Sequence, residues 1–168
     1  MASPAQYTWL RVFCRVFISV VGIALVLIVS TAVVFAQTQK MDAPTAYSAA
    51  RNGDLILLDI RSPAEWAETG IAEGAWPVTM HDAGFSTNLQ QILAAYPDRP
   101  VALICATGGR SNYVAGVLAD NNIPGVIDIA EGMFGNGDAP GWIARDLPIV
   151  DVQSARARHA AFILKHGE

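Results

Sequence analysis

Residues 101–111 read Val-Ala-Leu-Ile-Cys-Ala-Thr-Gly-Gly-Arg-Ser, and the expected architecture of the chain follows from this segment. Its first four residues are apolar and predict a short buried strand that ends at Cys105, and a helix is expected to begin near Ser111. Gly108 and Gly109 allow the backbone angles of a tight loop between the two elements. Unpaired N–H groups at a helix N-terminus attract anions and stabilise a thiolate. The segment therefore predicts a strand, an anion-binding loop and a helix, with a reactive thiol at the start of the loop.

The composition of the chain limits the classes of function. Its 168 residues suit one domain with an appendage. Every acidic residue lies from Asp42 onward, and the net charge is −4 without a basic stripe, which argues against nucleic-acid binding. Cys14 and Cys105 lie on opposite sides of a long apolar segment, so no disulfide is expected between them. Neither a CxxC motif nor a Cys/His cluster is present, so we expect no metal site, and nothing indicates an organic cofactor.

An uncharged apolar segment covers residues 16–36 and is long enough to cross a bilayer as one hydrophobic helix. Arg11 and Arg15 precede it and predict a cytoplasmic N-terminal end. Residues 1–36 are interpreted either as a membrane anchor or as a signal peptide cleaved after Ala36, and a buried core helix is a further alternative. The anchor and the signal peptide both export the remainder, to the periplasm of a bacterium. Residues 37–40 form a polar linker.

The remaining chain alternates between apolar runs and amphipathic segments, which predicts an α/β domain with a mostly parallel sheet flanked by helices over residues 41–150. Asp42 is expected to cap the first helix, and Ser86 or Thr87 a later one. The tail, residues 151–168, is expected to be helical, with its apolar residues 162–164 packed against the domain. Predicted strands cover residues 55–60, 76–79, 101–104 and 126–129. Predicted helices cover residues 42–51, 86–96 and 111–120, and another short helix is expected to begin at Ser62-Pro63.

Three segments in this order resemble the single-domain rhodaneses, which are thiosulfate-type sulfurtransferases. Residues 57–66, Leu-Leu-Asp-Ile-Arg-Ser-Pro-Ala-Glu-Trp, are similar to the first family signature together with Gly74-Ala75. Residues 105–111 fit the family pattern of Cys, two residues, Gly, one residue and Arg. Residues 131–134 and 142–149 are similar to the C-terminal signature. The resemblance implies a rhodanese-like fold and sulfur transfer through a cysteine persulfide.

The resemblance also implies the roles of individual residues. The thiolate of Cys105 would take sulfur from a thiosulfate-like donor and pass it to cyanide or a thiol, with a protein persulfide as another possible partner. Asp59 and Arg61 are expected to support the neighbouring loop, and a purely structural ion pair is the alternative. Ser111 is expected to support the site or cap the helix. The expected substrate-binding residues are Ala106, Thr107, Gly108, Gly109 and Arg110.

Three departures from the family pattern bear on the donor. Position 106 is Ala where many members carry Arg, position 70 is Gly where His is common, and residues 134–141 form a longer, glycine-rich segment. A sulfur carrier that holds a persulfide without turning over thiosulfate is therefore a second hypothesis. None of the three histidines has a spacing to Cys105 that indicates a catalytic pair.

Cysteine phosphatases and arsenate reductases also use a thiolate in an anion-binding loop. Their loops place Arg six positions after Cys, whereas Arg110 is five positions after Cys105 and position six is Ser111. The shorter loop favours a single sulfur atom over a tetrahedral oxyanion. A buried structural role for Cys105 is the remaining alternative. In an exported domain, a reactive thiolate is expected to be partly shielded or held as a persulfide.

Overall fold

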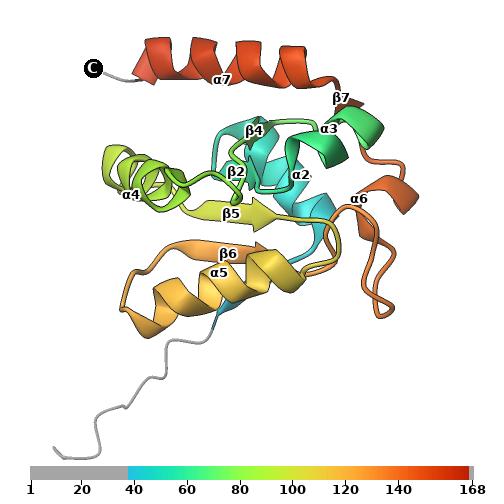
Figure 1. Ribbon diagram of the computed structural model, residues 1–168, viewed down its shortest axis with the longest axis horizontal. Helices are drawn as coiled ribbons and strands as arrows, with labels where there is room; N and C mark the ends of the chain where they lie inside the picture. The colour runs from blue at the N-terminus through green and yellow to red at the C-terminus, as the bar shows by residue number, and fades with distance from the viewer. Residues whose placement is uncertain (1–37, 167–168) are drawn as a thin grey trace, which may run out of the picture. The chain divides into compact units, whose positions relative to one another are not determined.

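The computed structural model describes residues 38–166, which form an α/β unit (Figure 1). The expected apolar helix over residues 16–36 lies outside these residues. None of the helices within residues 38–166 is long and apolar enough to span a membrane. The elements follow one another as β1 (Gln39–Met41), α2 (Ala43–Asn52), β2 (Ile56–Asp59), α3 (Pro63–Thr69), β3 (Ile71–Ala72), β4 (Ala75–Pro77), α4 (Phe85–Ala95), β5 (Val101–Ile104), α5 (Gly109–Asp120), β6 (Val126–Ile129), α6 (Gly141–Ala144), β7 (Ile149–Val150) and α7 (Val152–His166).

Five strands form a sheet in the order β1-β6-β5-β2-β4, and all of its neighbouring pairs are parallel. The expected mostly parallel sheet is therefore confirmed. A second, two-stranded antiparallel pair joins β3 to β7. β5, which carries the thiol loop at its end, lies between β2 and β6 in the middle of the large sheet. Carboxyl ends of parallel strands meet at one sheet edge, and sites in open α/β folds lie at that edge.

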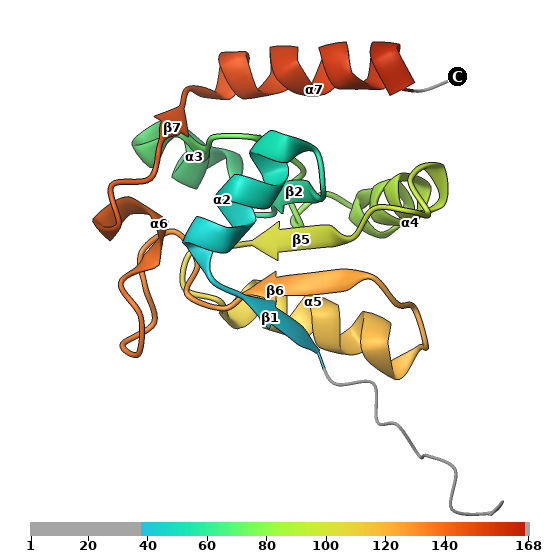
Figure 2. The same ribbon diagram turned by 180° about the vertical axis from the view of Figure 1, so that it is seen from behind.

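Apolar side chains pack on both faces of the sheet, which explains why the central strands are apolar without alternation. Helices α4 and α5 cover one face through Phe85, Leu89 and Val114. Helices α2 and α6 cover the other through Ala46 and Trp142. Figures 1 and 2 show α5 and α2 on opposite sides of the sheet. The thiol loop is thus built on a strand that is held from both sides.

Helix ends agree with the sequence at α2 and differ at α4. Asp42 caps α2 as expected, because its side chain accepts a hydrogen bond from the Thr45 N–H. The expected cap at Ser86 or Thr87 is wrong. Helix α4 begins at Phe85 after Gly84, and no side-chain cap bond closes it among the described residues. The N–H of Phe85 instead bonds to the carbonyl of Asp82, so a turn of the chain starts the helix.

Two further segments differ from expectation at the ends of the domain. Residues 39–41, assigned to the polar linker 37–40 and the domain start, form β1 and pair with β6 at the sheet edge. The tail forms helix α7, but the expected packing of Leu164 is wrong because this residue is 85% exposed. Helix α7 packs instead through Ala155, which is buried, and through His159, whose ring stacks on Trp76 of β4.

Candidate active site

Cys105 follows β5 directly and lies at the carboxyl edge of the sheet. Its side chain is buried, with only 1% of the residue exposed. The loop after it turns through Gly108, which has φ +84°, and α5 begins at Gly109. A Cβ atom at Gly108 would lie 1.9 Å from the Ala130 carbonyl oxygen, so only glycine fits this turn. The structure thus confirms a strand, a tight loop and a helix in the predicted order.

The chain segment after β6 holds the thiol loop from the side. The N–H of Met133 donates to the Cys105 carbonyl at 2.9 Å, and the N–H of Phe134 donates to the Ala106 carbonyl at 2.8 Å. Gly132 has φ +63°, and a Cβ there would lie 2.6 Å from the Ala106 carbonyl oxygen. Residues 131–134, distant in sequence, therefore brace the first two residues of the loop.

The five expected substrate-binding residues line the loop with different exposures. Thr107 and Gly109 are exposed, Ala106 and Arg110 are half-buried, and Gly108 is buried. The exposed position of Thr107 is consistent with the expected contact between this residue and a substrate. The thiol is thus shielded while the loop that covers it faces solvent.

Ser111 touches the sulfur atom from the first turn of α5. Its hydroxyl lies 3.4 Å from the Cys105 Sγ and 3.1 Å from the Gly108 carbonyl oxygen. The residue is fully buried. The N-cap position of α5 belongs to Gly108, so the cap role considered for Ser111 is not the one it has here. Ser111 instead offers its hydroxyl to the thiol and to the loop backbone.

Arg110 forms an ion pair with Glu65 of α3 beside the thiol. Its Nη1 lies 2.9 Å from Oε2 of Glu65, and its Nη2 lies 2.5 Å from Oε1. The hydrogen bonds from Arg110 lower the pKa of Glu65 from 4.5 to about 2. The same carboxylate raises the pKa of Arg110, and Cys105 adds to this rise. The guanidinium is therefore bound by Glu65, and its charge lies within reach of the thiol.

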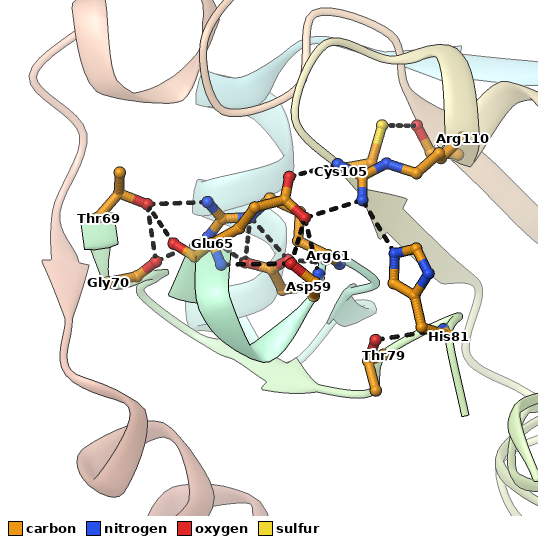
Figure 3. Close-up of polar contacts among 11 residues, drawn as sticks. Asp59, Arg61, Glu65, Thr69, Gly70, Thr79, His81, Cys105 and Arg110 are labelled. Carbon is orange, nitrogen blue, oxygen red and sulfur yellow. Dashed lines mark hydrogen bonds and ion pairs between the residues drawn. The ribbon is translucent and has the colours of Figure 1, made fainter. Parts of the chain in front are cut away.

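His81 lies on the other side of Arg110, as Figure 3 shows. Its Nε2 is 3.4 Å from the Arg110 Nη1, and because arginine donates only, the imidazole nitrogen faces it as an acceptor. The contact joins His81 to Arg110 and not to Cys105, so it is an addition to the residues that the sequence indicated for the site. A separation of 24 positions from Cys105 carries no signal of this contact, because the fold alone brings the loop after β4 to the thiol.

Asp59 and Arg61 form a second ion pair at the end of β2, and both side chains are 0% exposed. Arg61 binds the two carboxylate oxygens of Asp59 at 2.7–3.1 Å. It also donates to the Thr69 hydroxyl and the Gly70 carbonyl, at the end of α3. The pair therefore fixes the position of α3, the helix that carries Glu65. This geometry agrees with the structural alternative for these residues.

Glu65 also starts its own helix. The Ser62 hydroxyl and the Glu65 carboxylate form a capping box, in which each side chain binds the other residue's backbone N–H. The Ser-x-x-Glu spacing makes this cap readable from the sequence. The partnership of Glu65 with Arg110, 45 positions away, has no such signal.

Glu131 anchors the glycine-rich segment that follows β6. Its carboxylate accepts hydrogen bonds from the N–H groups of Ala43 and Gly141 and from the Arg145 Nε. Burial alone would raise the pKa of Glu131, but these hydrogen bonds and the charge of Arg145 hold it below the ordinary value. Glu131 therefore ties the start of α2 to the segment beside the thiol loop. Across residues 38–166, no group of His, Cys, Asp and Glu side chains is arranged to hold a metal ion.

A parallel sheet with a shielded cysteine in a short loop at its carboxyl edge defines a class of α/β proteins built around one reactive thiol. The model of the Rhodanese-like domain matches residues 42–136, more than half of the chain. The chain belongs to the rhodanese-like domain family. The match begins close to the start of the expected domain, residues 41–150, and contains the thiol loop.

Three comparisons show proteins that are similar to this chain in sequence or in structure. The uncharacterized protein RP600 of Rickettsia prowazekii (strain Madrid E) is 25% identical over 103 residues, which cover 58% of this chain and 84% of that protein. The crystal structure of Rv0390 from M. tuberculosis is 25% identical with a TM-score of 0.50, covering 66% of this chain and 96% of that one. The polysulfide-sulfur transferase homodimer from Wolinella succinogenes is 22% identical with a TM-score of 0.46, covering 70% and 81%.

Proposed function

We propose that the protein is a sulfurtransferase that carries one sulfur atom on Cys105. The observation that supports it best is the contact of the Ser111 hydroxyl with a shielded sulfur, at the N-terminus of α5. A helix N-terminus and a hydroxyl donor stabilise both a thiolate and the terminal sulfur of a persulfide. Nothing in this chemistry needs a metal ion or an organic cofactor.

In the first step, the Cys105 thiolate attacks the outer sulfur of a thiosulfate-like donor. A bond forms between the Cys105 sulfur and that sulfur, and the bond between the two donor sulfurs breaks. The electron pair of the broken bond leaves with sulfite, and the terminal sulfur stays on Cys105 as a persulfide anion. Ala106, Thr107, Gly108 and Gly109 supply the loop backbone that surrounds this sulfur.

In the second step, cyanide or a thiolate attacks the terminal sulfur of the persulfide. The new bond forms to the acceptor, and the electron pair of the broken sulfur–sulfur bond returns to Cys105 as a thiolate. The products are thiocyanate or a new persulfide, and the protein regains its starting state. A protein persulfide can serve as donor by the same exchange.

Arg110 supplies the positive charge for this exchange, in part. Its guanidinium is engaged by Glu65 and is 29% exposed, so it offers less charge to a dianion than a free arginine would. Position 106 is Ala, so it supplies no second positive charge to the donor. These two observations favour a second candidate function, in which the domain receives sulfur from a monoanionic persulfide and acts as a carrier.

A phosphatase or arsenate reductase is a poorer fit. Position six after Cys105 is Ser111, and its side chain is buried against the sulfur atom and the Gly108 carbonyl. An arginine there would have to occupy this buried space. The loop therefore suits one sulfur atom better than a tetrahedral oxyanion.

We also propose that the domain works outside the cytoplasm, on the periplasmic side in a bacterium. The support is the sequence alone, namely the uncharged segment 16–36 behind Arg11 and Arg15. Two arrangements remain open, a membrane-anchored domain and one released by cleavage near Ala36.

Turnover with cyanide separates the enzyme from the carrier. The full chain is supplied with thiosulfate and cyanide, and thiocyanate is measured over time. Continuous thiocyanate formation that Cys105→Ser abolishes supports the enzyme, with Cys14→Ser as the matched control expected to keep full activity. Loading of Cys105 from a low-molecular persulfide without thiocyanate formation from thiosulfate would support the carrier. Cys105 that accepts sulfur from neither donor would contradict both.

A further inference from the structure

Asp128 is a buried carboxyl group behind the site. It lies on β6 beside Leu103 of β5, and only 1% of the residue is exposed. Neither carboxyl oxygen has a hydrogen-bond partner within the described part of the chain. Burying a polar group without a partner costs free energy, and such groups are few in native proteins. Asp128 therefore calls for an explanation that core packing does not give.

The strand places Asp128 on the same face of the sheet as the thiol. Val126, two residues earlier on β6, belongs to the apolar cluster that contains Leu103, Cys105 and Val114. Alternate residues of a strand share a face, so Asp128 points toward this side, which α5 covers. The first turn of α5 carries Ser111. Asp128 thus faces the helix whose first turn carries the hydroxyl that touches the Cys105 sulfur.

Two opposing effects act on the carboxyl group. Burial raises the pKa of Asp128 and outweighs the influence of the neighbouring Ser111 hydroxyl, which lowers it. Lys40, its register partner on β1, lowers it as well, but this side chain is exposed. The charged group that acts on Asp128 is thus Lys40 from the edge strand. Burial without a hydrogen-bond partner favours the protonated acid.

The protonation state of Asp128 would determine which atom accepts the hydrogen bond from the Ser111 hydroxyl. A serine hydroxyl has one proton to donate and two lone pairs that accept. An ionised carboxylate at Asp128 would compete for that proton and turn a lone pair toward the thiolate. A protonated carboxyl would donate its own proton to the Ser111 oxygen and leave the serine O–H free for sulfur.

We propose that Asp128 is a positioning residue, a protonated acid that donates to the Ser111 oxygen and thereby directs the Ser111 hydroxyl at the Cys105 sulfur. The inference deepens the proposed function, because it names what holds the donor that stabilises the thiolate and persulfide. Its test uses only the reactivity of the thiol, so it does not require sulfur transfer to occur.

The test measures the alkylation rate of Cys105 by iodoacetamide between pH 5 and 10, in the full chain with Cys14→Ser. Asp128→Leu removes the donor and is expected to lower the rate near neutral pH about tenfold, the effect of one hydrogen bond to a charged group. Ser111→Ala is expected to lower it equally, and the double variant no further. Asp128→Asn keeps a neutral N–H donor and is expected to retain the wild-type rate and pH dependence.

Val126→Ala is the matched control, because it alters the same strand face two residues before Asp128, and its alkylation rate is expected to stay unchanged. An unchanged alkylation rate in Asp128→Leu would overturn the proposal. So would a rate loss caused by Asp128→Leu that is as large in the Ser111→Ala background as in the presence of Ser111. If Asp128→Leu does not fold, Asp128→Asn decides. A tenfold faster reaction in Asp128→Asn would mean that Asp128 is an anion beside the thiolate. Persulfide loading of the same proteins reports separately on the proposed function.

Discussion

Two acid–arginine pairs lie on neighbouring elements of this domain and differ in one respect, their exposure. Asp59 and Arg61 are both 0% exposed, and Arg61 also donates hydrogen bonds to the Thr69 hydroxyl and the Gly70 carbonyl. Glu65 and Arg110 are 26% and 29% exposed, and Arg110 also faces Cys105 and His81. The contacts of the buried pair therefore hold the end of β2 against the end of α3. The open pair keeps part of its charge available to the thiol.

The difference shows how one type of interaction serves two purposes. A buried pair is costly to break, because the remaining charge is left without compensation. A partly exposed pair contributes little to stability, because water screens it. We therefore expect substitutions in the first pair to unfold the protein and substitutions in the second to change its chemistry.

The largest effect is expected from Arg61→Met. It leaves Asp59 charged and unpaired in the interior, so the free energy of unfolding should fall by about 3–5 kcal/mol in urea denaturation. The double variant Asp59→Leu with Arg61→Met removes both charges and should recover much of this loss. If the free energy of unfolding falls by less than about 1 kcal/mol in Arg61→Met, the buried pair does not stabilise the fold.

Arg110→Met is expected to act on chemistry. The rate of persulfide formation on Cys105 should fall about tenfold to a hundredfold, the range for losing hydrogen bonds to a charged group. The free energy of unfolding should change by less than about 1 kcal/mol. Arg110→Lys keeps the charge but not the two-pronged contact with Glu65. A stability loss as large as that of Arg61→Met would abolish the contrast between the two pairs.

Glu65→Gln tests the open pair through pH. The pKa of Glu65 is lowered from 4.5 to about 2, so its contribution to stability is present above pH 4.5 and lost as the pH falls toward 2. The variant lacks this titration. The difference in unfolding free energy between wild type and Glu65→Gln should therefore shrink between pH 4.5 and 2. A difference that stays constant across this range would show that Glu65 is not paired in solution.

His81→Gln is expected to have the smallest effect. The contact with Arg110 is long and exposed, so the rate of persulfide formation should stay within about fivefold of wild type. The measurement is the loading rate from thiosulfate at pH 6 and 8. A loss of more than about tenfold at either pH would contradict this minor role of His81.

The sequence was sufficient for elements whose signals are local. The apolar run before Cys105, the glycines of its loop and the Asp42 cap each depend on residues a few positions apart, and each is found where expected. The family pattern identified the loop and the segment after β6 as two of its three signatures. Local chemistry is readable because strands, turns and caps obey short-range rules.

What sequence reasoning missed depends on contacts between distant segments. Glu65 meets Arg110 across 45 positions, and His81 reaches the same guanidinium from the loop after β4. Residues 39 and 40 were expected in a linker because this edge strand carries few apolar residues, yet they pair with β6. Leu164 is apolar and still exposed. These contacts and exposures depend on packing against residues that are distant in the sequence, so local patterns do not predict them.

Intact-mass analysis of the full chain after thiosulfate, and again after cyanide, tests the central claim most directly. The account predicts a gain of one sulfur atom on Cys105 that cyanide removes. The gain should persist in Cys14→Ser, weaken in Arg110→Met and vanish in Cys105→Ser. A chain that gains no sulfur from thiosulfate or from a low-molecular persulfide, while Cys105 remains reduced and reactive toward iodoacetamide, would contradict sulfur transfer at this site.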